Sequence, residues 1–326
     1  MKQSVVTRLA ASEPSDQLVI KKRSRVAETW TYVKRNYDLY LFILPVLVYF
    51  AIFHYIPMYG VQLAFRDYNP IDGILGSKWV GLEYFERFFN SAYFWTIIKN
   101  TVVISLYSLL IGFPAPLILA LLLNQLPSQK YKRFIQTVTY APHFISVVVI
   151  VGILMVFLSP STGIVNTMIT FFGGEPINFM AKPKLFSTLY VFSDIWQTAG
   201  WGAIIYLAAL AAISPELHEA AMIDGATKLQ RIRHIDIPGI MPTVIILLIL
   251  SLGGVMSLGF EKVYLMQNQL NVSSSEIIAT YVYKVGLQNG DFSFSTAVGL
   301  FNTVINFVLL VIVNRFAKRV SEHSLW

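Results

Sequence analysis

Six long apolar runs, each separated from the next by a polar segment, set the pattern of this chain. Each run is close to the roughly 20 residues that a helix needs to cross the hydrocarbon core of a bilayer. Proline and glycine interrupt several runs, which membrane helices tolerate where neighbouring helices cover the exposed backbone. The pattern predicts an all-α integral membrane protein with six transmembrane helices, at residues 39–59, 101–123, 140–158, 185–210, 241–260 and 296–313.

The basic residues favour alternate segments between these runs. They concentrate before the first run, after the second, after the fourth and after the last. Segments rich in Lys and Arg stay on the cytoplasmic side of a membrane. We therefore predict a multi-pass membrane protein with both termini and segment 214–239 in the cytoplasm. A soluble all-helical protein would not explain this match between spans and charge.

Three long polar segments face outward in this topology, at residues 66–100, 159–184 and 261–294. A short helix is expected within 82–90, and turns around another short helix within 159–184. Outer segments of this length usually contact another molecule. The alternative is that they only connect the spans.

The chain is expected to divide into four parts. Residues 1–37 form a basic cytoplasmic segment that ends in an interfacial helix. Residues 38–99 hold the first span and an outer loop. Residues 100–316 form the transmembrane core, and residues 317–326 a cytoplasmic tail. The polar start lacks the early apolar core of a signal peptide.

Composition supports a membrane protein, since 55% of the residues are hydrophobic and only 13% are charged. The formal net charge is +7. Because the basic residues flank apolar runs, this charge indicates membrane topology and no nucleic-acid partner. The absence of cysteine excludes disulfides, thiolate catalysis and cysteine-ligated metal sites.

Catalytic and nucleotide-binding motifs are missing from the sequence. The phosphate-binding pattern G-x-x-x-x-G-K-[ST] needs a Gly-Lys pair, which this chain lacks. The start of a metalloprotease pattern at His218 fails because Met222 replaces the second histidine. We therefore expect no enzyme, no metal site and no cofactor on this chain. Nucleotide energy would have to come from another chain.

The polar segment 214–239 has the pattern of a compact helical docking element. Ser214 is placed to cap a helix whose first residue is Pro215. That helix is expected to end near Gly225, and a second helical piece at 227–235 to end before Pro238.

Polar side chains inside the spans indicate a second functional region, because burying them in lipid is costly. Asp194, Gln197 and Trp201 share one face of the fourth span, and Trp196 lies beside them. The sixth span carries Asn302 and Asn306, and Glu261 ends the fifth. We predict a polar pathway with aromatic platforms, suited to a sugar. The alternatives are interhelical packing bonds and, for Glu261, an ion pair with Lys262 or another cation.

The docking segment resembles the cytoplasmic EAA loop of ABC importer permeases. That pattern is Glu-Ala-Ala, three residues, Gly, nine residues, then Ile-x-Leu-Pro, and here Ile237 replaces the Leu. The resemblance assigns ATPase coupling to Glu219, Ala220, Ala221, Asp224, Gly225, Ile235 and Pro238. Shorter stretches are similar to the carbohydrate-importer branch, and to permeases for alginate- or rhamnogalacturonan-type oligosaccharides. These are residues 55–60, 113–116, 142–146, 174–178, 199–202, 259–262 and 324–326.

The resemblance implies the MetI-like fold of a type I ABC importer. It also implies a location in the bacterial plasma (inner) membrane, a second homologous permease subunit, often in a heterodimer, and two ABC ATPase subunits that hold ATP and Mg. An extracytoplasmic solute-binding protein would deliver the oligosaccharide. A secondary transporter would instead need ion-coupling residues in several spans, whereas Asp194 is the clear intramembrane carboxylate. An intramembrane enzyme would need a catalytic pair.

Overall fold

The computed structural model describes residues 32–320, and the chain divides after Tyr59 into two compact units. Residues 32–35 are helical, which is the described part of the expected interfacial helix. The rest of that basic segment and the last six residues lie outside the described residues. The expected four-part division of the chain stays a prediction.

The first unit is one apolar helical rod that continues into the second unit. It consists of α2 (Tyr37–Phe50), a π-helical turn η1 (Ala51–Tyr55) and α3 (Ile56–Met58), followed by the 3-10 helix η2 (Tyr59–Phe65). The 29-residue run Tyr37–Phe65 is long and apolar enough to cross a membrane, and none of the residues of α2 is buried within the chain. Its apolar surface is therefore available to lipid.

The second unit begins with small elements, in the first of the segments that were expected to face outward. A two-stranded antiparallel sheet pairs β1 (Arg66–Asp67) with β2 (Lys78–Trp79) around α4 (Gly73–Gly76). The helix expected within 82–90 is present as α5 (Glu83–Phe89). Its Tyr84 hydroxyl donates to Asp67, 2.8 Å away. Burial and this carboxylate raise the pKa of Tyr84 to about 12, so the phenol remains a donor.

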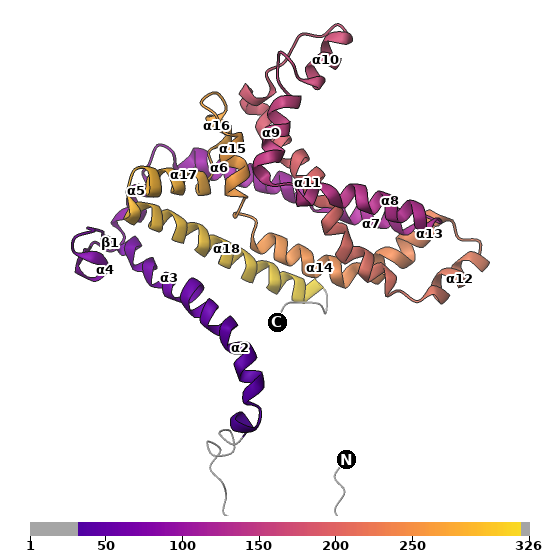
Figure 1. Cartoon of the computed structure of the whole chain (residues 1–326), viewed down its shortest axis with the longest axis horizontal. Coiled ribbons are helices and arrows are strands. Elements are labelled where there is room, and N and C mark those ends of the chain that lie inside the picture. The colour runs from indigo at the N-terminus through magenta and orange to yellow at the C-terminus, as the bar shows by residue number, and fades with distance from the viewer. Residues whose placement is uncertain (1–31, 321–326) are drawn as a thin grey trace, which may run out of the picture. The chain divides into compact units, whose positions relative to one another are not determined.

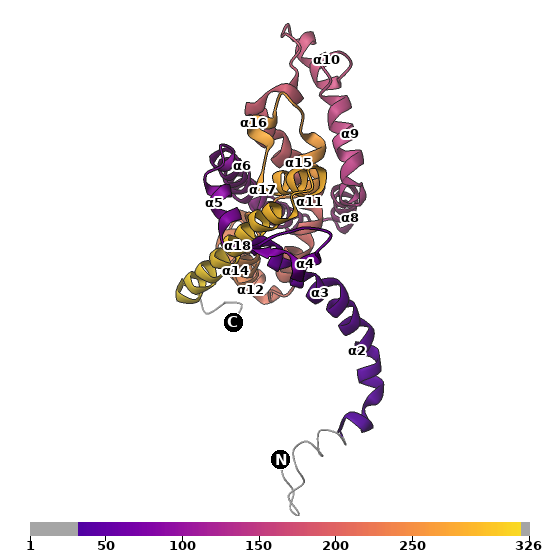
Figure 2. The same ribbon diagram turned by 90° about the vertical axis from the view of Figure 1, so that its left-hand side faces the viewer.

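The remaining helices of this unit follow α5 in the chain (Figures 1 and 2). Helices α9 and α10 extend away from the rest, and α14 lies along α18. The elements are α6 (Phe94–Tyr107), η3 (Ser108–Gly112), α7 (Pro114–Asn124), α8 (Gln129–Tyr140), η4 (Ala141–Phe144), α9 (Val147–Phe157), α10 (Ile164–Phe171), η5 (Phe179–Ala181), α11 (Pro183–Ala211), α12 (Pro215–Ile223), α13 (Lys228–Arg231), η6 (Ile232–Asp236), α14 (Ile237–Gly253), α15 (Phe260–Met266), α16 (Val272–Ser275), α17 (Ile278–Tyr283), η7 (Lys284–Gln288) and α18 (Phe292–Val320).

Four helical runs in the described residues meet the length and polarity of a membrane span by themselves. They are Tyr37–Phe65, Phe94–Asn124, Lys228–Gly253 and Phe292–Arg315. Two bent pairs bring the number to six if each pair is one span. One pair is Gln129–Phe144 with Val147–Phe157, at 101°, and the other is Pro183–Ala211 with Pro215–Ile223, at 73°.

Three helical runs continue through a proline near the start of one of their α-helices. Three π-helical turns, η1, η3 and η6, lead directly into helices with proline in the first two positions. Proline lacks an N–H and its ring clashes with the carbonyl four residues earlier, and a widened turn relieves both problems. The expectation that helix 227–235 ends before Pro238 is therefore wrong, because the helix continues to Gly253.

Helix boundaries also differ around the fifth apolar run. The run was expected to be helical over 241–260, but α14 ends at Gly253, where two consecutive glycines favour a break. No helix was predicted within the following segment, residues 261–294. It contains α15, α16, α17 and η7, because tertiary packing buries Val263, Met266, Ile277 and Ile278.

Helix α11 is the centre of the second unit. Its N-terminal half joins α6, α9 and α15 in one buried cluster, through Phe186, Tyr190 and Val191. Its C-terminal half joins α7 and α14 through Ala203, Tyr206 and Leu210. A third cluster, around Phe88 and Phe294, ties α5 and α6 to α17 and α18.

Glycine lets α11 approach α8 closely. A Cβ on Gly200 would lie 2.0 Å from the backbone oxygen of Thr139. Small residues at such crossings allow the close van der Waals packing that holds membrane helices together. The stretch 199–202 is therefore explained by packing between helices.

Candidate functional site

The segment expected to dock a partner forms a helix, a glycine turn and a second helix. Helix α12 starts at Pro215 and ends at Ile223, and Gly225 follows with a φ of 74°. Glycine adopts this left-handed conformation without the steric cost of a Cβ. Thr227 then caps α13 through a reciprocal capping box with Gln230.

The start of α12 differs from the expectation in one detail. Ser214 occupies the N-cap position, but its hydroxyl makes no capping hydrogen bond, so the predicted side-chain cap is wrong. Pro215 leaves one fewer backbone N–H unsatisfied at this end, and Glu216 interacts favourably with the positive end of the helix dipole.

Most residues of the predicted coupling set lie at the surface of the chain. Glu219, Ala220, Asp224, Gly225 and Pro238 are exposed. Within the described residues, Glu219 makes neither an ion pair nor a side-chain hydrogen bond.

An apolar surface and a small pocket accompany these exposed residues. The side chains of Ile223 and Leu229 are 87% and 74% exposed. Ala221 and Ile235 are half-buried and line a pocket of about 290 Å³ with residues of α13 and η6. Exposed apolar side chains with a polar rim are typical of protein interaction sites.

A buried carboxylate that the sequence analysis missed anchors α12 to the core. Asp236 is fully buried, and its Oδ1 lies 3.3 Å from Nε2 of His218 on α12. Its other oxygen, Oδ2, accepts a hydrogen bond of 2.9 Å from Gln125 at the end of α7. Three elements distant in sequence therefore meet at one carboxylate. The signal in the sequence was an acid between two isoleucines, in Ile235-Asp236-Ile237.

The predicted pathway face contains an ion pair between α11 and α15. Nζ of Lys262 lies 3.2 Å from Oδ1 of Asp194, and 5.3 Å from the ring centre of Tyr190. The Lys262 side chain is 5% exposed and that of Asp194 43% exposed. The alternative pairing of Glu261 with Lys262 is therefore wrong, and Glu261 is exposed without an ion pair in the described chain.

The other pathway residues predicted on α11 have separate surroundings. Gln197 is buried, and its Nε2 donates to the carbonyl of Ile145, at the bend between η4 and α9. This contact favours the packing alternative. The Trp201 ring stacks on His143, with centroids 4.5 Å apart and planes 4° apart. Trp196 is exposed.

The two asparagines of α18 also have different surroundings. Asn306 accepts from the backbone N–H of Met256 and donates to the hydroxyl of Ser257, so it holds the segment after α14. The Oδ1 of Asn302 is buried without a hydrogen-bond partner among the described residues. In the described part of the chain, neither asparagine forms a hydrogen bond with Asp194.

A cavity of about 340 Å³ lies between α6, α7, α11 and α14, at a place that the sequence analysis did not single out. Ser105 and Ser108 line it, and their buried hydroxyls have no hydrogen-bond partner in the described part of the chain. Buried polar groups normally find a partner, which can be an ordered water. The coupling and pathway assignments of individual residues stay predictions.

Comparison with known proteins relates this geometry to transport. Residues 112–322 match the family of the binding-protein-dependent transport system inner membrane component. The polygalacturonan/rhamnogalacturonan transport system permease protein YteP of Bacillus subtilis (strain 168) is 45% identical over 311 residues, 95% of this chain and 97% of YteP. Protein LplB of the same organism is 46% identical over 294 residues, 90% of this chain and 92% of LplB.

A solved structure has the same fold. It is the crystal structure of a bacterial ABC transporter involved in the import of the acidic polysaccharide alginate, and one of its chains superimposes with a TM-score of 0.84 at 40% identity. The match covers 90% of this chain and 99% of that chain. Since the family model covers most of the sequence and the relatives align over nearly its full length, this chain belongs to the binding-protein-dependent transport system inner membrane components.

Proposed function

We propose that this permease imports oligosaccharides derived from acidic polysaccharides, as a subunit of an ATP-driven ABC importer. The observation that carries the proposal is the likeness, over nearly the whole chain, to two permeases of related substrate. One is a polygalacturonan/rhamnogalacturonan permease, and the other belongs to an importer of the acidic polysaccharide alginate. Both substrates are rich in sugar carboxylates.

Six membrane spans are part of this proposal. The two bent pairs, α8–η4 with α9 and α11 with α12, each correspond to one predicted apolar run. In the α11–α12 pair, α11 alone has 29 residues, enough for a span, which leaves α12 free to lie at the surface. The distribution of Lys and Arg then directs both termini and α12 to the cytoplasm.

The partners follow from the same family. A second permease subunit completes the translocation pathway, and we propose a heterodimer. Two ABC ATPase subunits bind ATP and Mg and carry out hydrolysis, since this chain has no phosphate-binding loop. An extracytoplasmic binding protein delivers the sugar, as in the solved alginate importer complexed with a pentasaccharide-bound periplasmic protein.

Helix α12 provides the mechanical link to the ATPase in this proposal. Its exposed Ile223 and Met222 give an apolar contact surface, and the exposed Glu219 adds a charge. The contact of His218 with Asp236 transmits a displacement of α12 to α7 and α14. ATP binding drives transport if the closed ATPase dimer prefers the outward-facing permease.

The test is uptake by the reconstituted importer, with both permeases, both ATPases and the binding protein in proteoliposomes. We expect ATP-dependent uptake of a short oligogalacturonate, and ATPase stimulation only by the loaded binding protein. Carboxyl-reduced, neutral oligosaccharide of the same length is the control. Equal uptake of both sugars would contradict acidic-sugar specificity, and uptake without ATP would contradict the ABC mechanism.

A further inference from the structure

A polar pocket of about 390 Å³ opens where three elements distant in sequence meet, namely the first turns of α6, the start of α11 and the short helix α16. Its volume falls within the roughly 300–1,000 Å³ of small-molecule sites. Apart from Val103 and Pro183, every residue that lines it has a polar side chain. None of its residues belongs to the predicted coupling or pathway sets.

Two lysines give this pocket a positive charge that the described chain does not neutralise. Lys99 of α6 and Lys184 of α11 both line the pocket, and both are exposed. Neither forms an ion pair within residues 32–320. The carboxylates of the second unit that do form ion pairs have other partners, in Arg87–Asp291, His218–Asp236, Lys262–Asp194 and Lys284–Glu276.

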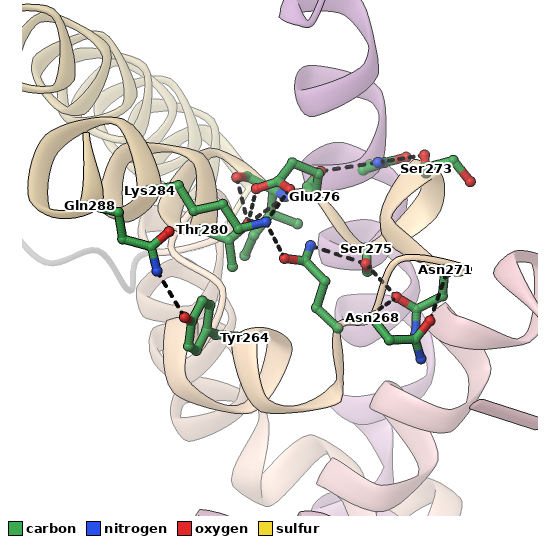
Figure 3. Close-up of polar contacts among 12 residues, drawn as sticks. Tyr264, Asn268, Asn271, Ser273, Ser275, Glu276, Thr280, Lys284 and Gln288 are labelled. Atoms are coloured by element: carbon green, nitrogen blue, oxygen red, sulfur yellow. Dashed lines mark hydrogen bonds and ion pairs between the residues drawn. The ribbon is translucent and has the colours of Figure 1, made fainter. Parts of the chain in front are cut away.

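The acid closest in sequence to the α16 wall is already occupied. Oε2 of Glu276 lies 2.6 Å from Nζ of Lys284, and its Oε1 accepts a hydrogen bond of 2.9 Å from Thr280 (Figure 3). Both carboxylate oxygens are therefore engaged away from Lys99 and Lys184. Glu276 therefore does not neutralise the positive charge that the two lysines give the pocket.

The same network makes the wall of the pocket rigid. Nδ2 of Asn100 donates to the carbonyls of Ser273 and Glu276, at 3.0 Å each, and so ties α16 to α6. Asn271 holds the other side of α16 through the carbonyls of Met180 and Met266. A site whose walls are held by buried hydrogen bonds is preorganised for a ligand.

The position of Lys184 is unfavourable for the helix itself. It is the second residue of the 29-residue helix α11, whose first turn contains no acidic residue. A cation at the positive end of a helix dipole is destabilising. The first turn of α6, which leads to Lys99, also lacks an acid. Residues that are locally unfavourable often lie at functional sites. A bound anion would offset the unfavourable interaction of Lys184 with the helix dipole.

We infer that this pocket binds a uronic acid residue of the incoming sugar, with Lys99 and Lys184 holding its carboxylate. Thr96, Ser187 and Ser274 offer hydroxyls for the hydroxyls of the sugar ring. The inference rests on the proposed function and deepens it, because it places a carboxylate-selective subsite at the outward ends of α6 and α11. A neutral sugar would leave both ammonium groups unpaired.

The test is direct binding of digalacturonate to the purified importer without its binding protein, measured by calorimetry. Lys99→Met with Lys184→Met removes the charges and keeps most of the side-chain bulk. We expect at least a tenfold higher Kd for digalacturonate in this double variant, and partial recovery with arginine at both positions. Lys182→Met is the matched control, because Lys182 is an exposed neighbour that does not line the pocket.

Three outcomes would overturn the inference. Digalacturonate could fail to bind the wild-type importer, it could bind the double methionine variant as tightly, or its neutral carboxyl-reduced form could be affected equally. If the double variant lost only its affinity for the binding protein, the pocket would be a docking surface instead. The proposed function is judged separately by uptake, since a wild-type importer that binds digalacturonate and does not transport it would contradict that function alone.

Discussion

Two charged residues of this permease, Lys262 and Asp236, are buried, and each has a polar partner. Lys262 is buried against Tyr190 and paired with Asp194, and Asp236 is buried between His218 and Gln125. A buried ion loses several kcal/mol of hydration, which its partner only partly restores. Removing one member therefore costs more than removing both.

The Asp194–Lys262 pair gives a prediction about stability. Asp194→Asn leaves Lys262 buried without a negative partner, and we expect a loss of about 1–3 kcal/mol, less than for a fully buried pair because Asp194 is partly exposed. Adding Lys262→Met should restore most of the loss. Thermal melting of the purified complex measures both changes, and additive losses in the double variant would show that the pair has no mutual role.

The His218–Asp236 contact gives a prediction about coupling. His218→Ala detaches the side chain of α12 from the core, and we expect ATP hydrolysis to continue while uptake per ATP falls about tenfold. His54→Ala is the matched control, because His54 is an exposed histidine on η1, outside the predicted coupling segment. An unchanged ratio of uptake to hydrolysis in His218→Ala would remove this contact from the coupling mechanism.

At the scale of elements, helix contacts depend on small residues and on local departures from α-helical geometry. Gly200 and Gly202 bring α11 against α8 and α7, where a Cβ would meet Thr139 and Pro116. The π-helical turns before Pro57, Pro114 and Pro238 let proline-containing helices continue. Both features fix how spans cross, and an apolar run does not contain that information.

Substitution of Gly200 tests the α8–α11 contact. Gly200→Ala places a methyl group 2.0 Å from the carbonyl oxygen of Thr139, so the helices must separate, and we expect a loss of roughly 1–3 kcal/mol. Gly299→Ala on α18 is the control, since a Cβ there meets nothing within 4 Å. A melting temperature for Gly200→Ala equal to that of the control would mean that the two helices are not in contact in the membrane.

At the scale of the whole molecule, the proposed topology separates two functional faces. Helices α12 and α13 lie at one end of the second unit, and α5 and α17 lie at the other (Figure 1). The first end carries the predicted coupling segment, and α5 and α17 at the second end belong to two of the segments expected to face outward. Placing them on opposite sides of the membrane lets an ATPase and a binding protein act on one permease without competing.

The absence of cysteine makes this topology directly testable. Single cysteines at Leu75 and Ile223, both strongly exposed, can be labelled with a membrane-impermeant maleimide in intact spheroplasts. We expect Leu75→Cys to react at once and Ile223→Cys to react only after the membrane is opened. Labelling of both positions in intact spheroplasts, or the reverse order, would contradict cytoplasmic placement of α12.

The sequence alone was sufficient to recognise the membrane character, the apolar runs, and the helix and glycine turn of segment 214–239. These features depend on local composition and spacing. An apolar run of sufficient length favours the bilayer, and a glycine permits the left-handed turn. The interaction partners of the buried polar residues became apparent only from the tertiary structure. Lys262 pairs with Asp194 instead of Glu261, and Asp236 with His218.

The proline-containing helix α14 and the pocket between α6, α11 and α16 also depend on tertiary structure. Pro238 does not end its helix, because the π turn before it absorbs the missing hydrogen bond. Lys99 and Lys184 are 85 residues apart in the chain. They line the same pocket because α6, α11 and α16 pack against one another. Such contacts arise from the crossing of helices, which depends on three-dimensional packing and has no local signature in the sequence.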